Sequence, residues 1–197
     1  MPIAAELLKL IIADQRETEQ LPSEYYHRDV EAKLNELTTN KEIIVMTGIR
    51  RSGKSVLLQQ IRHQAKEQDY YFNFEDERLA TFAVEDFQKL YEVFIELFGV
   101  QKTFYFDEIQ NIPGWEQFVR RLYNANNKIY LTGSNATLFS EELGTRLTGR
   151  YIPVRVYPFS FHEFSYYKEP EIFEKKNYST IQVGEIKKLF SEYCRLG

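Results

Sequence analysis

Two glycines, two arginines and a lysine stand close together in the stretch VMTGIRRSGKS, which runs from Val45 to Ser55. Gly48, Gly53 and Lys54 fit the spacing G-x-x-x-x-G-K-[ST], which is typical of loops that bind phosphate. Glycine permits the torsions and the close backbone approach that such a loop needs, and the amino end of a following helix favours an anion. The pattern therefore predicts a site for a polyphosphate.

Every position of this loop is a candidate nucleotide contact. We expect the ammonium group of Lys54 to reach the β- and γ-phosphates and the hydroxyl of Ser55 to ligate Mg²⁺. The alternative is a glycine-rich turn whose lysine faces solvent, but an apolar run before the loop and a helical pattern after it favour phosphate binding. The predicted nucleotide-binding residues are Gly48, Ile49, Arg50, Arg51, Ser52, Gly53, Lys54, Ser55 and Val56.

A second group of polar residues ends the apolar run TFYFDEIQ. We expect Asp107 to hold Mg²⁺, and Glu108 to accept a proton from the attacking water or to orient it. The alternative is that two adjacent acids simply end a strand in solvent. Here they follow the phosphate loop by two strand–helix units, and no N-K-x-D motif follows the fourth apolar run. The pattern therefore favours ATP hydrolysis over a GTPase of the Ras type.

The fourth apolar run ends in LTGSN. Polar side chains at this tip would lie beside Asp107 if the two strands are neighbours, so Ser134 or Asn135 is predicted to contact the γ-phosphate or the attacking water. Both residues are also ordinary N-caps for a following helix, and the two roles stay open at this point.

Two arginines follow in TRLTGRYIPV. An arginine supplied from the same chain or from a neighbouring subunit can stabilise charge in the transition state of phosphoryl transfer. We assign this role to Arg150, which stands between Gly149 and the fifth predicted strand, in preference to Arg146. The alternative is a pair of surface arginines on a helical connection.

Strand-length apolar runs alternate with helical patterns from residue 41 onward, and this alternation must position the candidate residues. Such an order implies crossover connections and a mainly parallel sheet covered on both faces, which is an α/β fold. We expect a helical segment over residues 1–40 that packs on the core, a core over residues 41–158 and a helical extension over residues 159–197. Ser160 and Glu163 offer a capping box at the start of that extension.

The composition sets limits on function. The 197 residues suffice for one domain with a real core, and 25 Lys and Arg against 29 Asp and Glu give a net charge of −4. The chain therefore lacks the general basic character of a nucleic-acid-binding domain, although a local basic patch stays open. Cys194 is the single cysteine, which excludes an internal disulfide. No signal peptide or membrane-spanning run is recognised, so we expect a cytoplasmic protein without a membrane partner.

Three stretches of the chain carry a family resemblance: GIRRSGKS, FYFDEIQNIPGWEQFVRRL and IYLTGSNATLFSEELGTRLTGRYIPVRVYPFSFHEF. Together they resemble the ATPase domain of the predicted AAA+ superfamily ATPase family AAA_14, over roughly Val30 to Phe164. The resemblance implies a P-loop three-layer α/β/α sandwich with a mainly parallel five-stranded sheet in the order 5-1-4-3-2. It also implies that Gly48 to Ser55 is the Walker A motif, that Asp107 and Glu108 form the Walker B motif, and that the GSN tip is sensor 1.

The resemblance carries expectations about function as well. Similar proteins usually continue into a further region that is often nuclease-like, so we expect this chain to be a fragment. The implied function is ATP binding and hydrolysis that depend on Mg²⁺ and are coupled to an effector, with self-association or a C-terminal effector domain as partners. The alternative is a slow nucleotide-dependent switch that regulates an attached domain or partner, and DNA handling is a weaker option.

Overall fold

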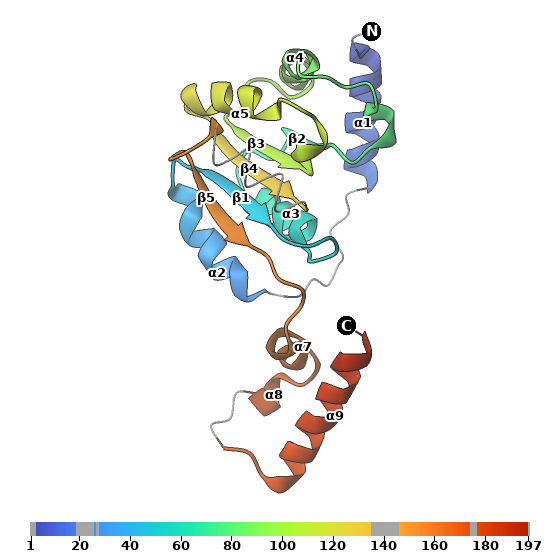
Figure 1. Ribbon diagram of the computed structural model, residues 1–197, viewed down its shortest axis with the longest axis vertical. Helices are drawn as coiled ribbons and strands as arrows, with labels where there is room; N and C mark the ends of the chain where they lie inside the picture. Colours follow the sequence, from blue (N-terminus) through green and yellow to red (C-terminus); the bar gives the residue numbers. More distant parts are fainter. Residues whose placement is uncertain (1–2, 19–25, 27, 135–145, 174–176, 197) are drawn as a thin grey trace.

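A computed structural model describes residues 3–18, 26, 28–134, 146–173 and 177–196 (Figure 1). In this part of the chain, parallel strands form one sheet in the order β2-β3-β4-β1-β5. The strands are β1 Ile43–Thr47, β2 Tyr71–Asn73, β3 Thr103–Asp107, β4 Lys128–Gly133 and β5 Tyr151–Arg155. This is the predicted order 5-1-4-3-2 read from the other edge, so the prediction of strand order is confirmed.

Strand β1 shows why these residues form a central strand. Ile43, Ile44, Val45 and Met46 have no exposed surface. Because neighbouring side chains of a strand point to opposite faces, Ile43 and Val45 pack into one apolar cluster and Ile44 and Met46 into another. A continuous apolar run is what a parallel strand covered on both faces requires.

Helices cover both faces of the sheet, as Figure 1 shows. Helices α1 (Ala5–Thr18), α4 (Asp86–Phe98) and α5 (Trp115–Asn124) lie on one face, over a core rich in phenylalanine. Helices α2 (Asp29–Glu36) and α3 (Lys54–Gln64) lie on the other face. Short 3₁₀ turns are η1 Leu37–Thr39, η2 Glu77–Leu79 and η3 Ile109–Asn111. The predicted three-layer α/β/α sandwich is therefore confirmed.

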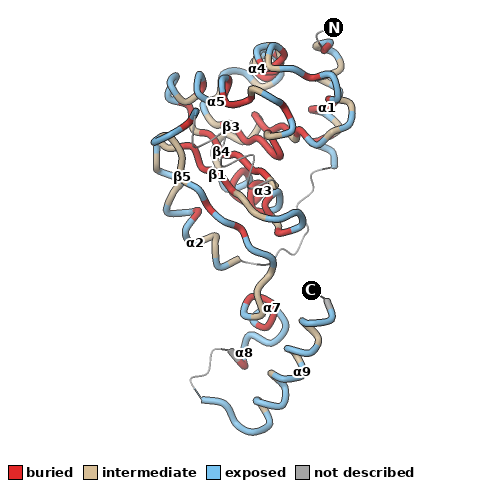
Figure 2. Tube along the Cα trace, viewed as in Figure 1, coloured by how far each residue is buried: buried red, intermediate tan, exposed pale blue. Residues whose placement is uncertain are grey.

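The chain leaves the sheet after β5 and forms helices α7 (Phe161–Lys168), α8 (Pro170–Phe173) and α9 (Thr180–Leu196). The predicted capping box is present, because the Glu163 N–H donates to Ser160 Oγ at 3.1 Å and the Ser160 N–H donates to Glu163 Oε2 at 2.7 Å. These helices lie apart from the sheet, and Figure 2 shows most of their residues exposed. The three segment boundaries stay predictions.

None of the helices in the described ranges is both long and apolar enough to cross a membrane. The cellular location of the protein stays a prediction.

The sheet brings the phosphate loop, the acid pair and Ser134 to the carboxyl ends of its strands. The phosphate loop follows Thr47 at the end of β1, Asp107 ends β3, and Ser134 follows β4. Because these strands are parallel, their carboxyl ends meet at the same edge, where ligands of open α/β sheets usually bind.

Candidate functional site

Close contacts at two glycines shape the loop between β1 and α3. A Cβ on Gly48 would overlap the carbonyl oxygen of Val156, and a Cβ on Gly53 would lie 2.9 Å from Nη1 of Arg28. Gly53 also has a φ of 92°, in the left-handed region that favours glycine. A larger residue at position 48 would meet the backbone and displace the loop, and a larger residue at position 53 would be strained by the positive φ, so this structure requires both glycines.

Lys54 is the first residue of α3 and is buried, with 3% of its surface exposed. Its Nζ donates to the carbonyl oxygens of Gly48 at 3.2 Å and Ile49 at 3.1 Å. The same Nζ lies 3.6 Å from Oε1 of Glu108. A buried ammonium group needs such partners, and these contacts hold the Lys54 ammonium group between the loop and Glu108.

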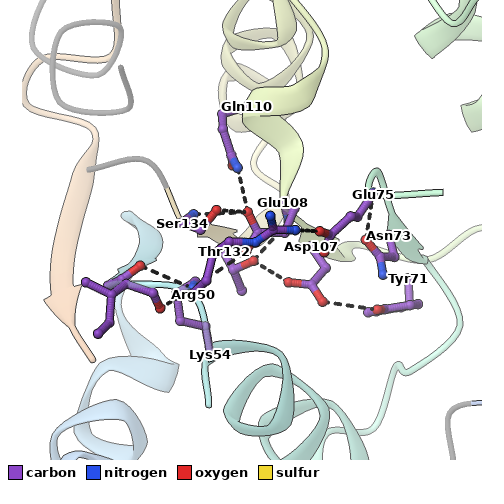
Figure 3. A network of polar contacts seen from close by, with 12 residues as sticks. Arg50, Lys54, Tyr71, Asn73, Glu75, Asp107, Glu108, Gln110, Thr132 and Ser134 are labelled. Atoms are coloured by element: carbon purple, nitrogen blue, oxygen red, sulfur yellow. Dashed lines mark hydrogen bonds and ion pairs between the residues drawn. The ribbon is translucent and has the colours of Figure 1, made fainter. Parts of the chain in front are cut away.

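The phosphate loop and Glu108 line one cavity of about 740 Å³. At its edge Arg50 forms an ion pair with Glu75, which follows strand β2 (Figure 3). Arg51 has a φ of 63°, and its side chain is exposed. Ile49 is 62% exposed and does not line the cavity. The lining residues are Arg50, Arg51, Gly53, Lys54, Ser55, Val56, Glu75 and Glu108.

Asp107 is buried, with 2% of its surface exposed. Its Oδ1 accepts from the Thr132 hydroxyl and its Oδ2 accepts from the Tyr71 hydroxyl at 3.4 Å, and the Ser55 hydroxyl donates to the same carboxylate. Burial raises the pKa of Asp107, although the hydrogen bonds from Thr132 and Ser55 and the charge of Lys54 oppose that rise. The carboxylate therefore favours an added positive charge.

Ser55 and Asp107 bring a hydroxyl oxygen and a carboxylate oxygen together, which are ligands that Mg²⁺ accepts. Within the described ranges, no three His, Cys, Asp or Glu residues gather into a metal site. Mg²⁺ usually combines one or two carboxylate or hydroxyl ligands with substrate phosphates and water. These two residues fit a cation that nucleotide phosphates help to hold.

Glu108 adopts a left-handed backbone conformation, with φ 50° and ψ 41°, which is uncommon outside glycine. Its N–H donates to Thr132 Oγ1 at 3.0 Å. Its Oε2 accepts from the Ser134 N–H at 3.0 Å, from the Ser134 hydroxyl at 2.7 Å and from Gln110 Nε2 at 2.5 Å (Figure 3). Burial acts to raise the pKa of Glu108, but the donors and the charge of Lys54 outweigh it and lower the pKa.

Ser134 was predicted to contact the γ-phosphate or the attacking water, and the structure places it on Glu108 through both its N–H and its hydroxyl. Asn135 lies outside the described residues. The structure therefore brings Ser134 to the acid pair, and its contact with the γ-phosphate or the attacking water stays a prediction.

Thr132, Tyr71 and Gln110 also contact the acids and were missed by the sequence reasoning. The Thr132 hydroxyl bridges the two acids, since it donates to Asp107 and accepts from the N–H of Glu108. A signal was available, because a threonine inside a buried apolar strand must find a hydrogen-bond partner. Tyr71 carries no such signal in an aromatic strand, and neither does Gln110 in the turn η3.

The structure does not bring Arg150 to this cavity. Its carbonyl oxygen accepts from the N–H of Ile43 at 2.8 Å, at the amino end of β1. The phosphate loop begins after Thr47, four residues further on, or about 13 Å along the strand. A role for Arg150 within its own chain is therefore not supported, and a role from a neighbouring subunit stays a prediction. Arg146 pairs with the buried Glu116 of α5.

Comparison with known proteins identifies relatives of the chain. The model of the AAA domain family AAA_14 matches residues 40–165. Uncharacterized protein MJ1544 of Methanocaldococcus jannaschii is 38% identical over 172 residues, which are 87% of this chain and 37% of that protein. An uncharacterized protein of Haemophilus influenzae is 39% identical over 165 residues, which are 79% of this chain and 38% of that protein. The chain thus spans less than two fifths of the length of these relatives.

Among solved structures, that of C. elegans PCH-2 aligns with a TM-score of 0.46 and 16% sequence identity, covering 89% of this chain and 50% of that one.

Proposed function

The chain belongs to the AAA domain family, and on this premise we propose that it binds ATP and hydrolyses it with Mg²⁺. One observation carries the proposal: Lys54 of the loop and Glu108 after β3 lie 3.6 Å apart and line the same cavity. Ser55 and Asp107 share a hydrogen bond beside them. A cavity of about 740 Å³ is large enough for a nucleotide-sized ligand.

Each group has a role in binding. The backbone N–H groups of the loop and the amino end of α3 favour the phosphates, and Lys54 offers its ammonium group to the same anion. Ser55 and Asp107 would hold Mg²⁺, which neutralises charge on phosphate oxygens when it is bound. Arg50 and Arg51 at the rim add positive charge, although Arg50 must leave Glu75 to do so.

Glu108 would act on the attacking water. A general base must be within hydrogen-bond reach of the proton that it takes, and it must have a free oxygen lone pair. Ser134 and Gln110 fix the orientation of this carboxylate through Oε2. Oε1 lies 3.6 Å from Nζ of Lys54, and both residues line the cavity. We assign Oε1 as the oxygen that meets the water, and Ser134 as the residue that orients the base.

A second function is favoured by the same contacts. Three hydrogen bonds on Oε2 and the nearby ammonium group lower the pKa of Glu108, and a weaker base hydrolyses more slowly. A slow nucleotide-dependent switch is therefore the alternative. Its effector would be a C-terminal domain, a second copy of the chain or a nucleic acid.

The test is ATP turnover by the purified chain with Mg²⁺ and with EDTA. We expect turnover that requires Mg²⁺ and is lost in Lys54→Ala, because the variant lacks the buried ammonium group. Lys66→Ala is the matched control, since Lys66 is exposed beyond the end of α3. Failure of the wild-type chain to bind ATP would contradict the proposal. Bound ATP that stays intact for minutes in a single-turnover experiment would favour the switch.

A further inference from the structure

We propose that Arg28 is a positioning residue for ATP, which joins the phosphate loop to helix α7 through Glu163. This inference rests on the proposed function and adds a route by which the α7–α9 region and the nucleotide influence one another. Arg28 precedes α2 and lies outside the loop, the acid pair and the sheet.

The guanidinium group of Arg28 contacts three separate segments of the chain. Its Nη1 donates to the carbonyl oxygen of Ser52 in the loop at 3.0 Å. Its Nη2 donates to the carbonyl oxygen of Tyr157 after β5 at 2.7 Å, and its Nε donates to Oε1 of Glu163 in α7 at 2.8 Å. Only 11% of the Arg28 side chain is exposed. The planar, rigid guanidinium group thus fixes the relative positions of all three segments.

At the loop, the hydrogen bond from Arg28 to the Ser52 carbonyl sets the orientation of the following N–H, which belongs to Gly53. The carbonyl and the N–H of a planar trans peptide point in opposite directions. When Arg28 holds the Ser52 carbonyl, it therefore turns the N–H of Gly53 away from the guanidinium group. Gly53 also lines the cavity, and its missing Cβ leaves room for Arg28, since a Cβ would lie 2.9 Å from Nη1. Arg28 thereby orients a loop amide for phosphate.

At α7, the contact uses a carboxylate that already caps the helix. Glu163 has a side chain only 6% exposed. Its Oε1 accepts from Arg28 Nε and from the Asp29 N–H at 3.0 Å, and its Oε2 accepts from the Ser160 N–H at 2.7 Å. Because one carboxylate serves both Arg28 and the first turn of α7, displacement of Arg28 disturbs the start of that helix.

The contacts predict a reciprocal effect. If Arg28 links the loop to α7, ATP binding must stabilise the start of α7 by the same factor by which an intact Arg28–Glu163 pair strengthens ATP binding. An ion pair that only stabilises the fold would change the melting temperature and would leave the affinity for ATP and this response unchanged.

The first measurement is the Kd for ATP with Mg²⁺, by calorimetric titration of the full chain. We expect Arg28→Met to weaken binding about tenfold or more, as loss of a charge-assisted hydrogen bond does. Glu163→Gln should weaken it less, because the loop contact of Arg28 remains. The matched control is Arg16→Met. Arg16 lies on α1, and its Nη1 forms an ion pair with Asp69 at 2.7 Å that this variant removes. The Kd of this variant for ATP should stay within about twofold of the wild-type value.

The second measurement is hydrogen exchange of the α7 backbone amides with and without ATP. The Phe164 N–H, which donates to the Ser160 carbonyl at 2.9 Å, is a suitable reporter. We expect ATP to slow its exchange in the wild type and in Arg16→Met, and to have no effect on it in Arg28→Met.

The outcomes separate this inference from the proposed function. If the wild type does not bind ATP, the proposed function itself is wrong. Suppose that the wild type binds ATP. If Arg28→Met then has a Kd for ATP within twofold of the wild-type value and ATP still slows hydrogen exchange in α7, the role of Arg28 is refuted. If Arg28→Met does not fold, Arg28→Lys and Glu163→Gln decide, since lysine keeps the charge but lacks the planar fork. The inference would be overturned if both of these variants bound ATP with wild-type affinity and showed the wild-type slowing of hydrogen exchange in α7 when ATP is added.

Discussion

The sheet carries a cavity and a buried or half-buried lysine at each end of its strands, which we call the carboxyl edge and the amino edge. At the carboxyl edge the cavity has a volume of about 740 Å³, and Lys54 donates to two loop carbonyls. At the amino edge the cavity has a volume of about 640 Å³, and Lys128 donates to the carbonyls of Leu37 at 3.0 Å, Asn40 at 2.6 Å and Glu42 at 3.5 Å. Size and a lysine therefore do not separate the two cavities.

The acids separate them. Glu108 lines the carboxyl-edge cavity and Asp107 lies beside it, whereas the described residues that line the amino-edge cavity include no Asp or Glu. There Tyr105 and Tyr130 stack with ring centroids 5.3 Å apart. The hydrogen bonds of Lys128 to backbone carbonyls therefore connect the segment before β1 to strand β4. An ammonium group beside two carboxylates can bind phosphate, metal and water together.

The largest expected difference between the edges is catalytic. Glu108→Gln removes the candidate base, and we expect ATP turnover to fall by about 10²–10⁴-fold while the Kd for ATP stays within about threefold. Lys128→Met at the amino edge should keep turnover within about twofold of the wild type. Steady-state phosphate release measures both variants. Unchanged turnover in Glu108→Gln, or an equal loss in Lys128→Met, would remove the functional distinction between the edges.

The next difference is in stability. Thr132→Val leaves Asp107 Oδ1 and the Glu108 N–H without their buried partner, and we expect the free energy of unfolding to fall by about 1–3 kcal/mol. The matched control is Thr103→Val near the amino edge, whose hydroxyl donates to Glu67 at 2.8 Å in a less buried position. Urea denaturation measures both. A loss in Thr103→Val that equals the loss in Thr132→Val would argue against the bridging role of Thr132.

A pH-dependent difference is expected at the amino edge. Burial lowers the pKa of Lys128 from 10.5 to about 8. Between these values the unfolded chain binds more protons than the folded protein, so the contribution of Lys128 to stability rises with pH. We expect the free energy of unfolding of the wild type to increase relative to Lys128→Met as the pH rises from 8 toward 10. A constant difference across denaturation curves in this range would show that Lys128 keeps an ordinary pKa.

The smallest effect is expected from Gln110, which donates to Glu108 Oε2 at 2.5 Å. This hydrogen bond lowers the pKa of Glu108, so its loss in Gln110→Leu should raise that pKa. Because the base must be ionised, the acidic limb of the pH–rate profile should move to higher pH. Gln88→Leu on the exposed face of α4 is the control. The assignment would be wrong if the two variants had the same acidic limb.

Much of the fold and part of the site could be predicted because they depend on neighbours in the sequence. The glycine spacing before Lys54, the alternation of apolar runs and helical patterns, and the capping box of Ser160 and Glu163 are all local patterns. The strand order came from the family resemblance. Asp107 was placed at a strand end from its position after an apolar run, and β3 ends there.

The tertiary structure alone decided three features of the site. Thr132 bridges both acids because β4 lies beside β3, and Arg150 lies at the far edge because β5 runs parallel to β1. Arg28 meets Ser52 and Glu163, which are 24 and 135 residues away in the sequence. No local pattern encodes such contacts, since they form only when the packed sheet and the chain after it bring distant segments together. The sequence by itself determined which chemical groups are available, and the packing decided which of them meet.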